Sequence, residues 1–220
     1  MMITRNALFA AGLIAASTPA LASMIDTTVA WNGSDNLQSF GSPNTATYGQ
    51  VVKATGSQLD AFSFIVDLPA TLQFQAYAYA WDGTKASGAA LFSSGAATDN
   101  GSGYNTVSFN TGGTPVSHGQ DYVLFLSISE VYAANGNDVT GAFASVDTAT
   151  YADGEFFWSN NGADFSLLTS QSWEKWFDGD FAFTARFSNG NPNQVPEPAM
   201  LALLGLGAIG LGVMKRRQAA

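Results

Sequence analysis

The segment from residue 72 to residue 81 constrains the fold most, because its side chains alternate with a period of two. Its even-numbered positions hold Leu, Phe and Ala, and its odd-numbered positions hold Gln, Tyr and Trp. This alternation predicts a β-strand with a small-residue face and an aromatic-polar face. Asp82 and Gly83 follow at once and predict a turn. No long stretch between residues 23 and 194 has the 3.6-residue period of an amphipathic helix, so we expect strands throughout.

Further strands are predicted by the same alternation or by continuous apolar runs. They are expected at Asp26–Trp31, Thr47–Ala54, Phe62–Asp67, Tyr104–Asn110, Tyr122–Ser129, Gly141–Asp147, Gly154–Trp158 and Phe181–Ser188. Clusters of Gly, Asn and Pro separate them, and Leu167–Phe177 is expected to form a helical turn or a loop. The pattern predicts an all-β domain over residues 23–188, an antiparallel β-sandwich of jelly-roll or immunoglobulin-like topology.

The first 22 residues have the three parts of a secretory signal peptide. Arg5 gives a positive start, an apolar run covers residues 7–16, and Ala20-Leu21-Ala22 forms an Ala-x-Ala site. We expect the secretion machinery to export the chain and cleavage to follow Ala22. An amphipathic first helix is the alternative, but the apolar run has no polar face.

The last 26 residues form a second composite signal. A linker at residues 189–194 leads to Val195, Pro196, Glu197 and Pro198. Sixteen uncharged residues, 199–214, follow them and end at Lys215, Arg216 and Arg217. At about 1.5 Å per residue, this apolar segment would span roughly 24 Å, so it predicts a short C-terminal hydrophobic helix that inserts transiently into a membrane. The basic end is expected to remain cytoplasmic.

Residues 195–220 resemble the PEP-CTERM sorting signal of Gram-negative exported proteins. The resemblance implies recognition and removal of the tail by an exosortase-like membrane protease. It also implies an inner-membrane intermediate and a final location at the outer surface or in the extracellular matrix. Such proteins commonly occur in bacteria with exopolysaccharide loci. A looser resemblance of segments within residues 72–127 to the β-sandwich cargo domains of such proteins implies the same fold and no catalytic residues.

The charge of the central region excludes several classes of function. Between residues 23 and 194, four basic residues face sixteen acids, which gives a formal charge of -12. Nucleic-acid binders need clustered Lys and Arg, so we expect no nucleic-acid partner. The absence of Cys excludes disulfides, thiolate zinc sites and cysteine nucleophiles.

Few residues suggest catalysis, and no catalytic residue is predicted. His118 is the single histidine, and it lies in a segment typical of a surface turn. No GxSxG motif is present. We therefore expect a noncatalytic surface or matrix protein, and the sorting signal together with the aromatic-polar strand faces suggests that it associates with exopolysaccharide. One alternative is a secreted carbohydrate-active enzyme with two carboxylates about 5 to 9 Å apart. Another is an adhesin that stays anchored in the membrane.

Two groups of side chains are candidates for ligand binding. Asp178 and Asp180 flank Gly179 and would share a side of an extended chain, so they are candidates for calcium; no other cofactor is expected. Tyr77, Tyr79, Trp81 and Trp158 are candidates for carbohydrate contact, since sugar rings stack on aromatic side chains. The alternative is that these rings pack in a second buried layer, as aromatic residues commonly do.

Overall fold

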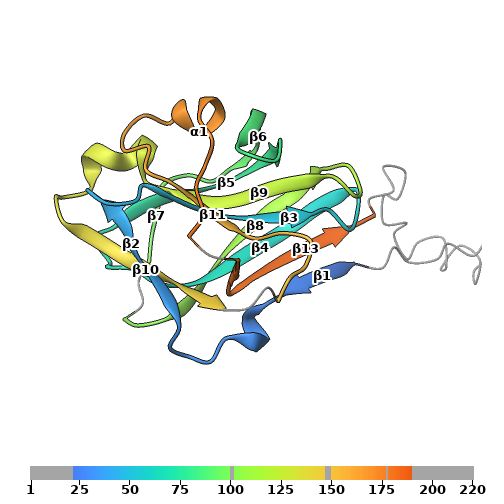
Figure 1. Cartoon of the computed structure of the whole chain (residues 1–220), viewed down its shortest axis with the longest axis horizontal. Helices are drawn as coiled ribbons and strands as arrows, with labels where there is room; N and C mark the ends of the chain where they lie inside the picture. Colours follow the sequence, from blue (N-terminus) through green and yellow to red (C-terminus); the bar gives the residue numbers. More distant parts are fainter. Residues whose placement is uncertain (1–21, 100–101, 147–149, 177, 190–220) are drawn as a thin grey trace, which may run out of the picture.

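The computed structural model describes residues 22–99, 102–146, 150–176 and 178–189. Two antiparallel sheets form this part of the chain, with short helices outside them (Figure 1). The helices are η1 (Thr28–Ala30), η2 (Ser129–Ala134) and α1 (Leu167–Ser170). The all-β antiparallel sandwich predicted from the alternating sequence is therefore confirmed.

The first sheet contains seven of the described strands, and β4 is its centre. The strand order is β1-β13-β4-β10-β12, with β2 paired to β10 and β8 paired to β4. The bounds are β1 (Ser23–Asp26), β2 (Asn36–Ser42), β4 (Gln58–Asp67), β8 (Asn105–Pro115), β10 (Val139–Val146), β12 (Asp180–Phe181) and β13 (Phe183–Ser188). Most neighbours are far apart in the sequence, so this sheet forms only when distant segments meet.

The second sheet contains six of the described strands, in the order β11-β3-β9-β5-β6, with β7 paired to β5. The bounds are β3 (Thr47–Lys53), β5 (Gln73–Trp81), β6 (Ala86–Ser93), β7 (Ala97–Thr98), β9 (Asp121–Ser127) and β11 (Phe156–Ser159). The strand predicted at Tyr122–Ser129 is β9, which lies inside the sheet between β3 on one side and β5 on the other. Its burial explains why it lacks a polar face.

Aromatic rings dominate the core between the sheets. Phe143 is fully buried, and its ring centroid lies 4.8 to 5.5 Å from the centroids of four other buried rings. These rings belong to Phe40, Tyr48, Phe64 and Phe181. The small-residue face of β5 also lies in this core. Alanines on that strand leave volume for rings from elsewhere, which suits the close packing of protein interiors.

The other face of β5 is covered as well. Tyr77 and Tyr79 contact Phe125 and Phe165, and Trp173 packs against Phe125, in a second buried cluster that the segment around α1 closes. Figure 1 shows α1 lying outside the sheet, next to β6. The second sheet is therefore buried on both faces in this region.

Several element bounds differ from the prediction for local reasons. The strand expected at Asp26–Trp31 is wrong, because β1 covers Ser23–Asp26 and stops where the Asp26 carboxylate accepts hydrogen bonds from the backbone N–H and the hydroxyl of Thr28. This Asx-type turn starts η1 in place of a longer strand. Similarly, Ser127 accepts a hydrogen bond from the backbone of Ser129 and ends β9. The sequence reasoning missed β2 and β6, whose Gly and Ser content weakens the alternation.

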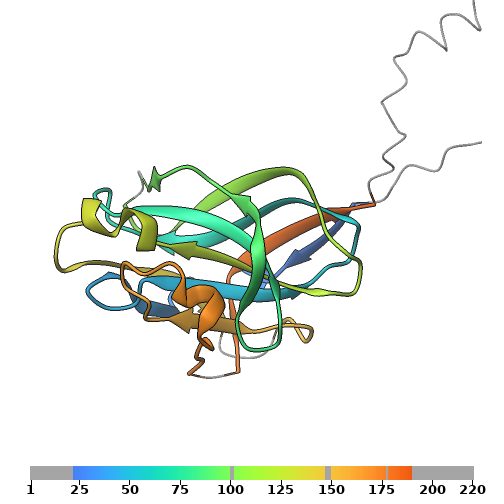
Figure 2. The ribbon, with the colours of Figure 1, turned by 90° about the horizontal axis from the view of Figure 1, so that it is seen from above.

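The two ends of the described chain lie side by side. Ser23 in β1 pairs with Phe187 in β13, and Asp26 pairs with Thr184. Figure 2 shows both strands reaching the same side of the domain. The segments that precede residue 23 and follow residue 188 therefore start from one place on the sandwich.

Candidate functional site

A polar cleft of about 580 Å³ lies where β2, β4 and β10 meet the start of β8. Its lining consists of Gln38, Ser39, Asp67, Leu68, Pro69, Ser102, Gly103, Tyr104, Thr140, Gly141 and Ala142. Sheet pairing creates this meeting point, because Asp67 at the end of β4 pairs with Ala142 of β10, and Gly141 pairs with Phe40 of β2. The volume falls in the range typical of small-molecule sites, about 300 to 1,000 Å³.

Gly141 allows the strands to approach each other in the cleft floor. A Cβ atom at this position would lie 2.5 Å from Leu68 Cδ2 and 2.7 Å from the carbonyl oxygen of Asp67. Both distances are shorter than a carbon atom tolerates, so only Gly fits without movement of β4. The backbone of Ser39 has φ of +77°, an uncommon conformation for a residue with a side chain. The floor and one wall of the cleft thus depend on special backbone geometry.

Asp67 is the sole carboxylate among the described residues that line the cleft. It is half-buried, and no hydrogen bond or ion pair of its side chain occurs within the described residues. Tyr104 lies close enough to respond to its charge. Burial raises the pKa of Tyr104, and the negative charge of Asp67 raises it further. The cleft therefore contains a carboxylate that is partly shielded from water and has acceptor capacity to spare.

An aromatic pair flanks the cleft. The rings of Tyr104 and Trp31 meet edge to face, with centroids 4.9 Å apart and planes at 61°. Trp31 Nε1 donates a 2.8 Å hydrogen bond to the carbonyl oxygen of Asp35, which fixes the indole in place. Tyr104, which lines the cleft, therefore places an aromatic side chain in the same cleft as the carboxylate, and Trp31 packs against it. The sequence reasoning placed Tyr104 in a strand and did not single it out.

A hydrogen bond between the sheets supports the wall of the cleft. The hydroxyl of Tyr48, in β3, donates a 2.5 Å hydrogen bond to the carbonyl oxygen of Gln38, in β2. Tyr48 is fully buried, and burial raises the pKa of its phenol to about 12. The backbone of Gln38 is therefore held by the core, while its side chain is exposed at the cleft.

The four aromatic residues predicted for carbohydrate contact have different surroundings. Tyr77 and Tyr79 are 3% and 7% exposed and belong to the second buried cluster. Trp81 is half-buried and packs against Phe157 at a centroid distance of 4.7 Å. Trp158 is half-buried beside Trp176. The packed second layer weighed in the sequence analysis thus accounts for Tyr77 and Tyr79, which present no open ring face.

Trp158 and Trp176 form an aromatic platform on the edge of the second sheet. Their ring centroids are 5.0 Å apart, and Trp176 is 54% exposed. The indole Nε1 of Trp158 is buried without a hydrogen-bond partner in the described residues. An antiparallel bridge between Trp158 and Glu174 joins β11 to the segment that contains Trp176. The sequence analysis proposed Trp158 for carbohydrate contact, and the structure shows the ring of Trp176 packed beside it.

The structure does not bring the predicted calcium residues Asp178 and Asp180 into one environment. The side chain of Asp178 is 82% exposed and accepts a hydrogen bond from Lys175. Asp180 is fully buried, where its carboxylate accepts hydrogen bonds from Gln50 Nε2 and from the backbone N–H of Tyr151. Burial raises the pKa of Asp180 above its ordinary value. Within the described ranges, no three His, Asp or Glu side chains gather as metal ligands would.

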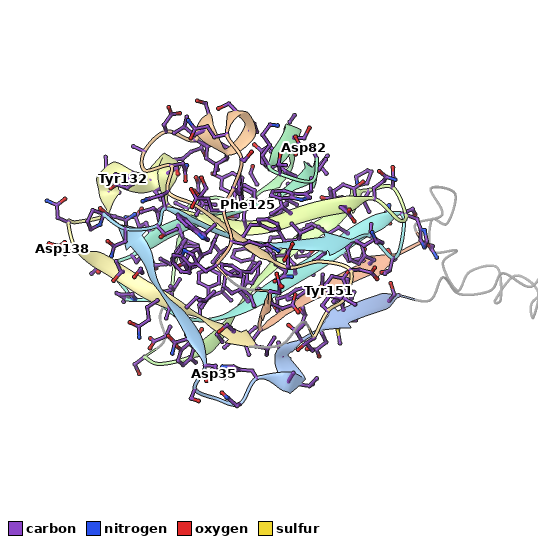
Figure 3. All side chains as sticks on the ribbon, viewed as in Figure 1. Asp35, Asp82, Phe125, Tyr132, Asp138 and Tyr151 are labelled. Carbon is purple, nitrogen blue, oxygen red and sulfur yellow. The ribbon has the colours of Figure 1, made fainter. Side chains whose placement is uncertain are left out.

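Other acids are spread over separate turns. Asp35, Asp82 and Asp138 lie at different margins of the domain (Figure 3). Asp82 accepts hydrogen bonds from the backbone N–H groups of Thr84 and Lys85 and stabilises its own turn. His118 is exposed in a turn, as its sequence context predicts.

The predicted sorting elements lie mostly outside the described residues. This holds for the signal peptide up to Leu21, including Ala20, and for the tail with Val195, Pro196, Glu197, Pro198, Lys215, Arg216 and Arg217. Ala22 is described and exposed. Within the described ranges, no helix has the length and apolar character needed to cross a membrane.

Among the solved structures that share the fold, two are of the protease Cwp84. One is the clostridial cysteine protease Cwp84 after propeptide cleavage, with a TM-score of 0.51 and 15% identity over 77% of this chain and 40% of that one. The other contains the cysteine protease and lectin-like domains of Cwp84, a surface layer associated protein of Clostridium difficile. It has a TM-score of 0.50 and 17% identity, over 77% of this chain and 36% of that one. The chain thus matches less than half of each structure, and this low identity shows the fold alone.

Sequence comparison identifies the tail. No curated protein matches the chain. The family model described as the PEP-CTERM protein-sorting motif matches residues 194–217, which contain the Pro-Glu-Pro sequence, the apolar segment and the basic cluster. Directly upstream lies the β-rich domain described above. The chain is therefore an exported protein with a PEP-CTERM sorting motif behind an antiparallel β-sandwich.

Proposed function

We propose that this protein is a noncatalytic component of the cell surface or extracellular matrix that associates with exopolysaccharide. The observation that carries the proposal is the PEP-CTERM motif at residues 194–217, joined to a folded domain with a polar, aromatic-rimmed cleft. Export places the domain among extracellular polymers, and the cleft offers the groups that hydroxyl-rich ligands require.

The proposed route follows from the two signals. The secretion machinery moves the chain across the inner membrane, and the apolar segment holds it there as an intermediate. An exosortase-like protease then removes the tail, and the domain reaches the outer surface or matrix of a Gram-negative bacterium. Mass spectrometry of the native protein tests this route. A C-terminus upstream of the apolar segment supports processing, whereas an intact Lys215-Arg216-Arg217 end contradicts it and favours the anchored adhesin.

The lining of the cleft favours binding over hydrolysis. Hydrolysis of a glycosidic bond commonly uses two carboxylates about 5 to 9 Å apart. The described cleft offers Asp67 alone, and the acids at residues 35, 82 and 138 lie on separate turns (Figure 3). The cysteine protease chemistry named for Cwp84 has no nucleophile here, because the chain contains no Cys.

Retention on the producer's own exopolysaccharide tests the proposed association. The purified native protein is passed over immobilised polymer, with an inert agarose column and a denatured sample of the same protein as controls. Retention of the folded protein alone supports the proposal. Elution together with an inert marker protein overturns it. Release of soluble sugar from the column would instead establish the carbohydrate-active enzyme.

A further inference from the structure

We propose that the cleft lined by Gln38, Ser39, Asp67, Tyr104 and Thr140 binds a neutral saccharide unit, whose hydroxyl groups donate hydrogen bonds to Asp67. This assignment rests on the proposed association with polysaccharide and names its site and ligand class. The cleft of about 580 Å³ is open enough for part of a polymer chain to enter from the surface.

The carboxylate of Asp67 is the group in the cleft that most favours a ligand rich in hydroxyls. Several other aspartates of the domain have partners: Asp26 and Asp164 accept hydrogen bonds in their own turns, and Asp60 and Asp180 bond to side chains elsewhere. Asp67 is half-buried yet has no hydrogen-bond or ion-pair partner within the described residues. A carboxylate that has lost part of its hydration gains most from donors on a ligand. Two neighbouring hydroxyls of a sugar supply two such donors.

Other polar side chains in the cleft can also form hydrogen bonds with a ligand. Gln38, Ser39 and Thr140 line the same cleft, and none of their side chains has a hydrogen-bond partner in the part of the chain that the structure describes. An amide and two hydroxyls provide both donors and acceptors. A sugar hydroxyl also does both, so these groups complement one another. An apolar ligand would leave all of them without partners.

The walls of the cleft are held before a ligand arrives. Tyr48 fixes the carbonyl oxygen of Gln38, and Gly141 lets β10 lie against β4 without a side chain between them. Tyr104 is packed against Trp31, whose indole is itself hydrogen-bonded. Little ordering is therefore required on binding, which reduces its entropic cost. The aromatic rim offers a surface for the C–H face of a sugar ring.

Charge selects a neutral saccharide over an anionic one. None of the described lining residues is Lys, Arg or His. The four basic residues of the central region, Lys53, Lys85, Lys175 and Arg186, each pair with a nearby carboxylate. A uronate or phosphate group would meet the negative charge of Asp67 without a compensating cation. Repulsion between like charges then disfavours binding.

Matched substitutions test the assignment. Each variant is expressed from the full-length gene in the producing bacterium and purified in the form that the bacterium exports. Asp67→Asn removes the charge and keeps the shape, and Gln38→Ala removes an exposed side chain that the fold does not use. Asp138→Asn is the control, because it makes the same change at an exposed residue outside the cleft lining. Asp138 has φ of +61°, a conformation that Asn also accepts. Thermal melts establish that each variant is folded.

The readout is the affinity for the producer's exopolysaccharide, separated by anion exchange into neutral and anionic fractions. We expect wild type and Asp138→Asn to bind the neutral fraction equally. Asp67→Asn should bind at least about tenfold more weakly, because hydrogen bonds to charged groups are the stronger ones. Gln38→Ala should also bind more weakly, by a smaller factor.

The outcomes separate this inference from the proposed function. Wild type that binds neither fraction overturns the polysaccharide association itself. Wild type that binds while folded Asp67→Asn and Gln38→Ala bind equally well overturns the cleft assignment alone. Loss of binding in Trp176→Ala, with no loss in the cleft variants, would place the site on the aromatic platform instead. Binding to the anionic fraction only would overturn the ligand class.

Discussion

Replacing Tyr48 by Phe is expected to lower the stability of the sandwich at neutral pH and to remove part of its sensitivity to alkali. The hydroxyl of this fully buried residue joins the two sheets through its 2.5 Å hydrogen bond to the carbonyl oxygen of Gln38. Without the hydroxyl, that carbonyl oxygen loses its donor. We expect the free energy of unfolding to fall by about 1 to 2 kcal/mol at neutral pH.

The dependence on pH follows from the shifted pKa. Burial raises the pKa of Tyr48 from 10.0 to about 12. A phenol whose pKa is raised by folding contributes stability that is fully present below the unfolded pKa and is lost as pH rises through the folded pKa. At about pH 11, linkage between these two pKa values lowers the free energy of unfolding by about 1.4 kcal/mol. Tyr48→Phe has no such group and escapes this loss.

Urea unfolding of wild type and Tyr48→Phe at about pH 8 and about pH 11 measures the effect. The stability difference between the two proteins should shrink by about 1.4 kcal/mol at the higher pH. Other tyrosines titrate in both proteins and cancel in the comparison. Phe143→Leu is the control, since it perturbs the same ring cluster without changing a titrating group. A difference between wild type and Tyr48→Phe that is identical at both pH values would refute the reasoning.

Three further outcomes are expected. Gly141→Ala should lower the free energy of unfolding by about 1 to 3 kcal/mol, because its Cβ would lie 2.7 Å from the backbone oxygen of Asp67 in β4. The control is Gly95→Ala, whose Cβ would lie in open space and should leave thermal melts nearly unchanged. Phe143→Ala should lower the free energy of unfolding, measured with urea, by about 3 to 5 kcal/mol, since the fully buried ring of Phe143 contacts four other rings. Calcium and chelator should leave the melting temperature unchanged, because Asp178 and Asp180 already have protein partners; a calcium-dependent rise would contradict this.

The fold could be predicted because its strongest signal is local. Alternation along β5 and the apolar run of β9 follow directly from which faces of a strand are buried. The β2 strand escaped prediction because its conformation depends on its partner. Gly41 fits against β10, where a Cβ would meet the carbonyl oxygen of Val139. Such a requirement arises between strands and leaves little pattern along the sequence.

The candidate cleft could not be predicted for a related reason. Gln38, Asp67, Tyr104 and Thr140 are distributed over about a hundred residues and meet only through the pairing of β2, β4 and β10. The aromatic prediction found real rings but could not distinguish the buried Tyr77 from the half-buried Trp158. Their exposure depends on the segment around α1, which covers one ring and not the other. By contrast, the sorting motif is continuous in sequence, so sequence alone identified it.

The pairing of β1 with β13 also determines when an exported chain can fold. The first described strand finds its partner only after residues 184–187 are available, and β13 in turn pairs with β4. A chain that crosses a membrane starting with its N-terminus therefore remains incomplete until nearly the whole domain has passed. The sorting motif begins at residue 194, six residues after β13 ends. The last strand can therefore pair only shortly before the tail reaches the membrane. A chain that stops before β13 lacks both its last strand and its sorting motif.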